Sequence, residues 1–176
     1  MWVPADQLGN TEPPSFMTQL RGDFDRAGVR SAGGWLLAGL HAEFDIRREG
    51  YDFHYHCIGA GEKIAAIDEG LRGLPKYQQG QPEPHEVGLP EHPRVRISRA
   101  PLYNLPDPLT YVVQSSYPHR PTFVDKNGTL RRGTRKRRIP EPYHTQWLLW
   151  MDRWSISDMV LLSGLRVTRD GFRVTR

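Results

Sequence analysis

Residues 51–59 read YDFHYHCIG, with two histidines separated by one tyrosine inside a largely apolar run. Side chains two positions apart on a β-strand lie on the same face, so His54 and His56 are expected side by side. The preceding stretch 35–46, WLLAGLHAEFDI, alternates apolar and polar residues and predicts another strand. The residues RREG between the two stretches suit a hairpin loop. The sequence therefore predicts two antiparallel strands with a histidine pair on one face.

The polar face of the first strand carries His41 and Glu43. If RREG closes the hairpin, Glu43 faces His54 and His41 faces His56, with Cβ atoms about 4.5–5.5 Å apart. Imidazole and carboxylate together suit a divalent cation, so these four residues form the candidate metal site. The alternative is that the histidines are structural residues of a half-exposed strand.

The remaining hydrophobic pattern predicts an α+β fold, with helices packed on a central antiparallel sheet. Helices are expected at 15–29, 62–74 and 107–114, and a short strand, RVRIS, at 94–98. The last quarter of the chain adds two amphipathic helices, in YHTQWLLWMDRW and ISDMVLLSGLR. The tail RVTRDGFRVTR predicts a small hairpin around its Asp-Gly pair.

Composition narrows the class of protein. The chain has 176 residues, one cysteine, 15 prolines and 17 glycines, which favours one modest core with long loops. A single cysteine excludes an internal disulfide and fits a reducing compartment. The sequence has no apolar run of membrane-spanning length and no signal-peptide pattern at its start. These features predict a cytoplasmic protein without a membrane partner.

Charge is distributed unevenly along the chain. Residues 1–120 contain 12 Lys and Arg against 15 Asp and Glu, whereas residues 121–176 contain 12 against 5. This contrast predicts an acidic domain at 1–120, followed by a basic helical extension at 121–176 that contacts a polyanion such as DNA. Six of eight residues in RRGTRKRR are cationic: Arg131, Arg132, Arg135, Lys136, Arg137 and Arg138. Their alternative role is that of a solvated loop.

A glutamate-bearing strand, a short turn, a strand with His-Tyr-His and a following helix resemble the HUH endonucleases, above all the rolling-circle replication initiators of bacterial plasmids and phages. The resemblance covers about residues 15–115 and depends on HAEFD, HYH and YVVQ. It implies that His54 and His56, with Glu43 or alternatively His41, hold Mg²⁺ or Mn²⁺. It also implies that residues 1–120 form an HUH-like nuclease domain, with a tyrosine nucleophile on a later helix.

Tyr111 in PLTYVVQSS is the expected nucleophile, and Tyr117 in SSYPHR is the second candidate. For Tyr111 the alternative is a core aromatic of an amphipathic helix. Members of the family often carry lysine three residues after the tyrosine, where this chain has Gln114. The N-terminal strand of the family also looks missing or reduced in MWVPADQLGN.

The expected function is metal-dependent nicking and strand transfer of single-stranded origin DNA, through a 5′-phosphotyrosine link. The resemblance implies host replication proteins as further partners. Two other functions remain open at this point: a DNA-binding protein that kept the fold and lost the chemistry, and an unrelated metal-binding hydrolase. Gln114 and the reduced first strand favour the DNA-binding alternative.

Overall fold

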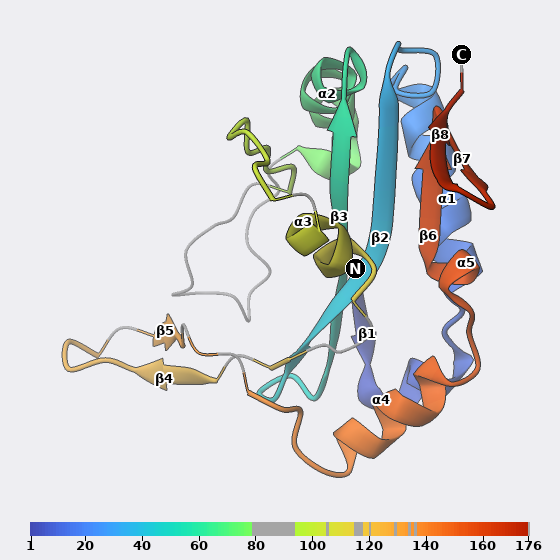
Figure 1. Ribbon diagram of the computed structural model, residues 1–176. Helices are drawn as coiled ribbons and strands as arrows, with labels where there is room; N and C mark the ends of the chain where they lie inside the picture. Colours follow the sequence, from blue (N-terminus) through green and yellow to red (C-terminus); the bar gives the residue numbers. More distant parts are fainter. Residues whose placement is uncertain are drawn as a thin grey trace.

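Figure 1 shows the computed structural model of the chain, which describes residues 1–78, 94–104, 106–114, 118–119, 121–128, 130–133, 135 and 137–175. Its centre is an antiparallel hairpin of two long strands, β2 (Trp35–Asp45) and β3 (Gly50–Ala60). Two short strands, β1 (Trp2–Pro4) and β6 (Val160–Ser163), complete a four-stranded antiparallel sheet in the order β1-β3-β2-β6. The expected α+β class with a central antiparallel sheet is therefore confirmed.

The other elements lie around this sheet. The helical segments are η1 (Ala5–Asn10), α1 (Pro13–Arg26), α2 (Lys63–Ala66), η2 (Ile67–Leu71), η3 (Pro75–Tyr77), α3 (Pro106–Val112), α4 (Tyr143–Met151) and α5 (Ile156–Met159). Two small hairpins are also present: β4 (Thr122–Val124) with β5 (Leu130–Arg132), and β7 (Leu165–Thr168) with β8 (Gly171–Val174). The expected helices at 15–29, 62–74 and 107–114 thus correspond to α1, to α2 with η2, and to α3.

The main hydrophobic core lies on one face of the sheet, which α1 and α4 cover. Leu36 and Leu40 of β2 alternate onto this face, where they meet the buried apolar side chains of α1. Aromatic rings dominate the end near α4: the Trp147 ring lies 5.2 Å from that of Tyr51, and the Trp150 ring lies 5.6 Å from that of Phe53. The two helices therefore leave the other face of the sheet to α3.

A second, smaller core lies on that other face. It consists of Leu37 from β2, Ile58 from β3 and Val112 from α3, all buried. Leu109 of α3 and Leu162 of β6 pack against it. This small core holds α3 against the face of the central hairpin that also carries the histidines.

A buried lysine ties the start of α2 to the segment before β2. Lys63 is 2% exposed, and its Nζ donates to the carbonyl oxygens of Val29, Arg30 and Ala32 at 2.8, 3.2 and 2.9 Å. An ammonium group has three donors and no acceptor, so these three carbonyls satisfy it fully. The contact holds the 29–32 segment that leads into β2.

Two expected elements have a different structure. RVRIS at 94–98 belongs to no strand, although Val95 is buried in the main core and Ile97 packs against it. Its alternating pattern therefore reflects the packing of Val95 and Ile97 on the main core, without strand pairing. In ISDMVLLSGLR, the helix α5 ends at Met159, and Val160 is extended with φ −126° and ψ 138°. The following residues form β6, because the free edge of β2 pairs with them.

The C-terminal third is more than a basic helical extension. Residues 121–176 contribute β6 to the central sheet and α4 to the main core, and they also form the hairpins β4–β5 and β7–β8. The sheet and core therefore extend across the expected boundary at residue 120. The N-terminal strand β1 is three residues long and pairs with β3. Within the described residues, no helix combines the length and apolar character required to cross a membrane.

Candidate metal and tyrosine site

Three histidines meet on the face of the sheet that α3 covers. His41 on β2 lies directly opposite His54 on β3, and His56 follows two positions along β3. One ring nitrogen from each residue can be chosen so that all three lie within 4.8 Å of one another. Two neighbouring, fully paired strands hold the three imidazoles, so their backbone positions are fixed by the ladder.

The predicted strand register was wrong by two positions. Glu43 lies opposite Asp52, not His54, and Gly39, not His41, lies opposite His56. The last strand pair before the loop is Asp45 with Gly50, so the loop begins one residue earlier on β2 than predicted. A two-residue shift keeps every side chain on its face, because strand side chains alternate with a period of two. The histidines therefore share a face as expected, although their partners differ.

The hairpin turn explains the register. The Asp45 carboxylate accepts a hydrogen bond from the backbone N–H of Arg47 at 2.9 Å. Glu49 takes the left-handed conformation, with φ 48°, immediately before β3 begins. This capped turn places the loop at 46–49, one residue earlier than the sequence pattern indicated.

Hydrogen bonds orient the His54 ring. Its Nδ1 lies 3.1 Å from the carbonyl oxygen of Asp52, which can only accept, so Nδ1 is the protonated nitrogen. In the neutral ring, Nε2 then keeps its lone pair, and it lies 3.1 Å from Nε2 of His56. Two nitrogen ligands on one ion are about 3.0–3.4 Å apart when each bond is about 2.1 Å long. The backbone carbonyl would then be the outer-shell acceptor that metal-binding histidines commonly have.

His41 connects the site to α3. Its side chain is 3% exposed, and its Nε2 lies 3.0 Å from the carbonyl oxygen of Val112. Because a carbonyl only accepts, Nε2 carries the proton and Nδ1 keeps the lone pair. The same imidazole contacts the end of α3, and one of its ring nitrogens belongs to the cluster.

A glycine lets α3 approach the sheet. Gly39 lies opposite His56, and a Cβ atom built at position 39 would lie 2.0 Å from the carbonyl oxygen of Val112. Only a residue without a side chain permits this approach, since real Cβ contacts are essentially never below 3.0 Å. The helix that carries Tyr111 is close to the histidines because of this position.

Tyr111 lies against the cluster. Its ring centroid is 4.7 Å from that of His56 in an edge-to-face arrangement, and 5.2 Å from that of His41. The residue is 38% exposed, so part of its side chain is accessible from solvent. The structure thus brings together His41, His54, His56 and Tyr111. Tyr117 lies outside the described residues.

Glu43 stands apart from this cluster. It shares the face of His41 two positions along β2, but the group of ligand atoms within 4.8 Å comprises the three histidines alone among the described residues. Glu43 lies instead near His119. Burial lowers the pKa of the His119 imidazole, and the charge of Glu43 opposes this shift in part. The third imidazole therefore takes the place that the sequence assigned first to glutamate.

The basic run begins on a projecting hairpin and reaches the body of the protein at Arg137, whose backbone exchanges hydrogen bonds of 2.8 and 2.9 Å with that of His119. Arg131 and Arg132 belong to β5, in a hairpin that projects from the body of the protein (Figure 1). Arg131 pairs with Asp125 at 2.9 Å, and Arg138 contacts Glu141 at 3.0 Å. Arg135 and Arg137 are exposed, and Lys136 lies outside the described residues. Two of these cations thus have carboxylate partners, and the DNA-binding role of the run stays a prediction.

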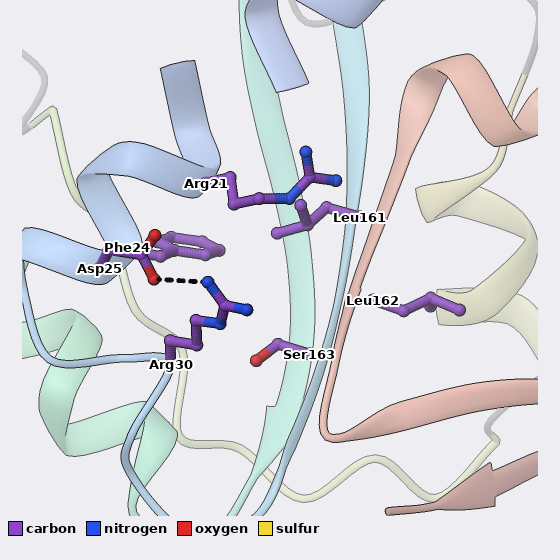
Figure 2. Close-up of a pocket in the computed structure, with 7 residues that line it drawn as sticks. All are labelled: Arg21, Phe24, Asp25, Arg30, Leu161, Leu162 and Ser163. Atoms are coloured by element: carbon purple, nitrogen blue, oxygen red, sulfur yellow. Dashed lines mark ion pairs between the residues drawn. The ribbon is translucent and has the colours of Figure 1, made fainter. Parts of the chain in front are cut away.

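A hollow on the opposite side of the sheet is separate from the histidines (Figure 2). It lies between α1, the 28–34 segment and β6, and Arg30 within it pairs with Asp25 at 3.5 Å. Leu161 and Ser163 of β6 line the hollow. They pair with Ala38 and Leu36 of β2, whose side chains belong to the main core. The hollow therefore opens on the α1 side of the sheet.

The sequence pattern missed three groups that build the site. They are Gly39, the carbonyl of Val112 and the carbonyl of Asp52. A glycine inside an otherwise apolar strand was the available signal, since it commonly marks close backbone approach. The two carbonyls have no sequence signal.

Comparisons with known proteins give no relative for this chain: no family model, no curated protein and no solved structure matches it.

Proposed function

We propose that the protein is a metal-dependent nuclease of the HUH type, which cuts single-stranded DNA with Tyr111 and remains joined to its 5′ phosphate. The observation that supports this most directly is the contact of the Tyr111 ring with two of three clustered imidazoles. A phenol beside a cation site is the arrangement that phosphoryl transfer to tyrosine needs. A single chain thereby supplies the nucleophile and the site for the charge that polarises the phosphate.

His41, His54 and His56 are the residues that would hold the ion. Imidazole nitrogen suits transition-metal ions better than Mg²⁺, so Mn²⁺ is the better choice of the two ions expected. When bound, the ion withdraws electron density from the phosphate oxygens and orients the scissile bond. The hydrogen bond from Nδ1 of His54 to the Asp52 carbonyl supports this role, because it leaves Nε2 of His54 with its lone pair.

Tyr111 carries the chemical step in this proposal. Its oxygen forms a bond to phosphorus, and the bond from phosphorus to the 3′ oxygen breaks. The proton lost by the phenol is balanced by the proton gained by the 3′ oxygen, so the reaction consumes no water and is reversible. Contact with His56 and the 38% exposure of Tyr111 allow the hydroxyl to meet a strand that arrives from solvent.

The test is a covalent adduct that survives denaturation. Single-stranded oligonucleotides that tile the DNA around the coding sequence, labelled at the 3′ end, are incubated with the protein and Mn²⁺. The label should migrate with the protein, and mass spectrometry should locate it on Tyr111. Tyr111→Phe keeps the ring and should abolish the adduct, whereas Tyr103→Phe, at a position 92% exposed in the segment leading to α3, should not.

Other results would select another function. An adduct lost in Tyr117→Phe and kept in Tyr111→Phe would move the nucleophile and keep the reaction. Tight DNA binding without any adduct would favour a DNA-binding protein that lost the chemistry, with Gln114 as a reason. A metal response without DNA affinity would favour an unrelated metal-binding hydrolase.

A further inference from the structure

The C-terminal hairpin β7–β8 is a two-stranded ribbon at the outer side of β6 (Figure 1). Gly164, with φ 68°, turns the chain from β6 into β7. The backbone N–H of Thr175 donates to the carbonyl of Gly164 at 2.9 Å and closes the base of the ribbon. The ribbon forms a two-stranded sheet of its own and does not pair with β2 or β3. Nothing in the proposed chemistry uses it.

Its two faces differ in character. Arg166 pairs with Arg173, and Val167 pairs with Phe172. Because side chains alternate along each strand, the arginines share one face, and Val167 and Phe172 share the other with Leu165. One face is therefore cationic, and the other is apolar.

The cationic face is unfavourable in the isolated protein. Like charges directly opposite each other on paired strands destabilise a sheet. The described carboxylate that pairs with these arginines is Asp170, at 3.6 Å from Arg173, and both groups are exposed. Arg169, at the turn, adds a third exposed cation. Anionic groups outside the chain would remove this repulsion.

The base of the ribbon lies on the same side of the sheet as Tyr111. Leu165, the first residue of β7, packs against the small core of Leu37, Ile58 and Val112. Val112 follows Tyr111 on α3 and accepts the hydrogen bond of His41. The ribbon is thus anchored to the structure that positions the proposed nucleophile.

We propose that the cationic face of this ribbon binds the phosphate backbone of duplex DNA, with Arg166, Arg169 and Arg173 as the phosphate contacts. A two-stranded β-ribbon is narrow enough for the major groove, which is about 12 Å wide. Contacts to phosphate fix the position of a protein on DNA without reading its sequence. The inference rests on the proposed function, since it assigns to the ribbon the double-stranded DNA that flanks the single strand at Tyr111.

The test measures binding of the full chain to a fluorescent 20-base-pair duplex in EDTA, by anisotropy from 0.05 to 0.3 M salt. Arg166→Gln with Arg173→Gln should weaken binding about 10- to 60-fold at 0.1 M salt and reduce the salt slope by about 1.8, since each phosphate contact contributes about 0.9. The same variant should unfold at an equal or higher temperature than the wild type, because it removes a repulsion. Weaker binding therefore cannot be attributed to unfolding.

The matched control is Arg21→Gln with Arg30→Gln, which removes two charges from the hollow on the opposite side of the sheet (Figure 2). It should bind duplex DNA about as well as the wild type. Equal losses in both double variants, an unchanged salt slope in the ribbon variant, or a wild type that does not bind the duplex would each overturn the proposal. So would binding to phosphatidylserine vesicles in place of the duplex.

The adduct assay separates this inference from the proposed function. Duplex binding that depends on the ribbon, in a protein that forms no adduct, would support the ribbon and reject the nuclease. An adduct on single-stranded oligonucleotides, in a protein whose ribbon variant binds the duplex normally, would support the nuclease and reject the ribbon.

Discussion

The ring of Tyr111 meets the ring of His56 edge to face, with centroids 4.7 Å apart, although the residues come from α3 and β3 and are separated by 54 intervening residues. Two features produce this contact: the absence of a side chain at Gly39, and the hydrogen bond from His41 to the carbonyl that follows Tyr111. The position of the tyrosine thus depends on a glycine without chemical function and on a histidine that is also a proposed metal ligand.

Gly39→Ala should displace α3. The new methyl group would overlap the carbonyl of Val112, and overpacking of this kind costs about 1–3 kcal/mol. Chemical denaturation should show this loss in the free energy of unfolding, and the yield of the covalent adduct should fall with it.

The control for this change is Gly73→Ala, because a Cβ atom at position 73 meets no atom within 4 Å. Its stability and adduct yield should remain near those of the wild type. If Gly39→Ala behaved like this control, the close approach of α3 would not hold in solution.

Mn²⁺ should raise the midpoint of thermal unfolding. A ligand that binds only the folded state at about 100 times its Kd adds about 2.7 kcal/mol, which corresponds to about 5–10 °C in a chain of this size. His54→Ala with His56→Ala should remove the increase. We expect differential scanning fluorimetry with and without Mn²⁺ to show this, with Mg²⁺ as the comparison ion.

The control for the metal experiment is His144→Ala, which removes a histidine outside the cluster. It should keep the response to Mn²⁺. A response that persisted in the double histidine variant would assign the ion to another part of the chain.

Neutralising the basic run should weaken DNA binding for all sequences alike. Arg135→Gln, Lys136→Gln and Arg137→Gln together should reduce the slope of log affinity against log salt by about 0.7 for each lost contact to single-stranded DNA. Anisotropy titrations on two oligonucleotides of unrelated sequence measure this. If the triple variant kept the salt slope of the wild type, these three cations would not contact the DNA.

Lys63→Met should destabilise the fold. Methionine fills a similar volume, but three carbonyl oxygens lose their donor. Leaving the buried carbonyl of Val29 unpaired costs about 1–3 kcal/mol. Urea denaturation should therefore give a lower midpoint, while Lys126→Met, in an exposed turn, should change it little. An equal midpoint for both variants would show that Lys63 does not stabilise the fold by holding the 29–32 segment.

The local elements of this protein follow from short-range pattern. The alternation of apolar and polar residues predicted β2 and β3, and it placed His41, His54 and His56 on one face, because the period of a strand is a local property. The same holds for α1, α4 and the β7–β8 hairpin, whose Asp-Gly turn is visible in the sequence.

Contacts between distant segments needed the tertiary structure. The register of the central hairpin depends on the turn at Asp45 and Glu49, and a difference of two positions leaves the face pattern unchanged, so the pattern cannot reveal it. The chain after residue 120 looked like a basic extension, yet β6 joins the sheet because β2 offers it an unpaired edge. The meeting of Tyr111 with the histidines likewise depends on backbone groups at Gly39 and Val112, and backbone carbonyls are the same in every residue.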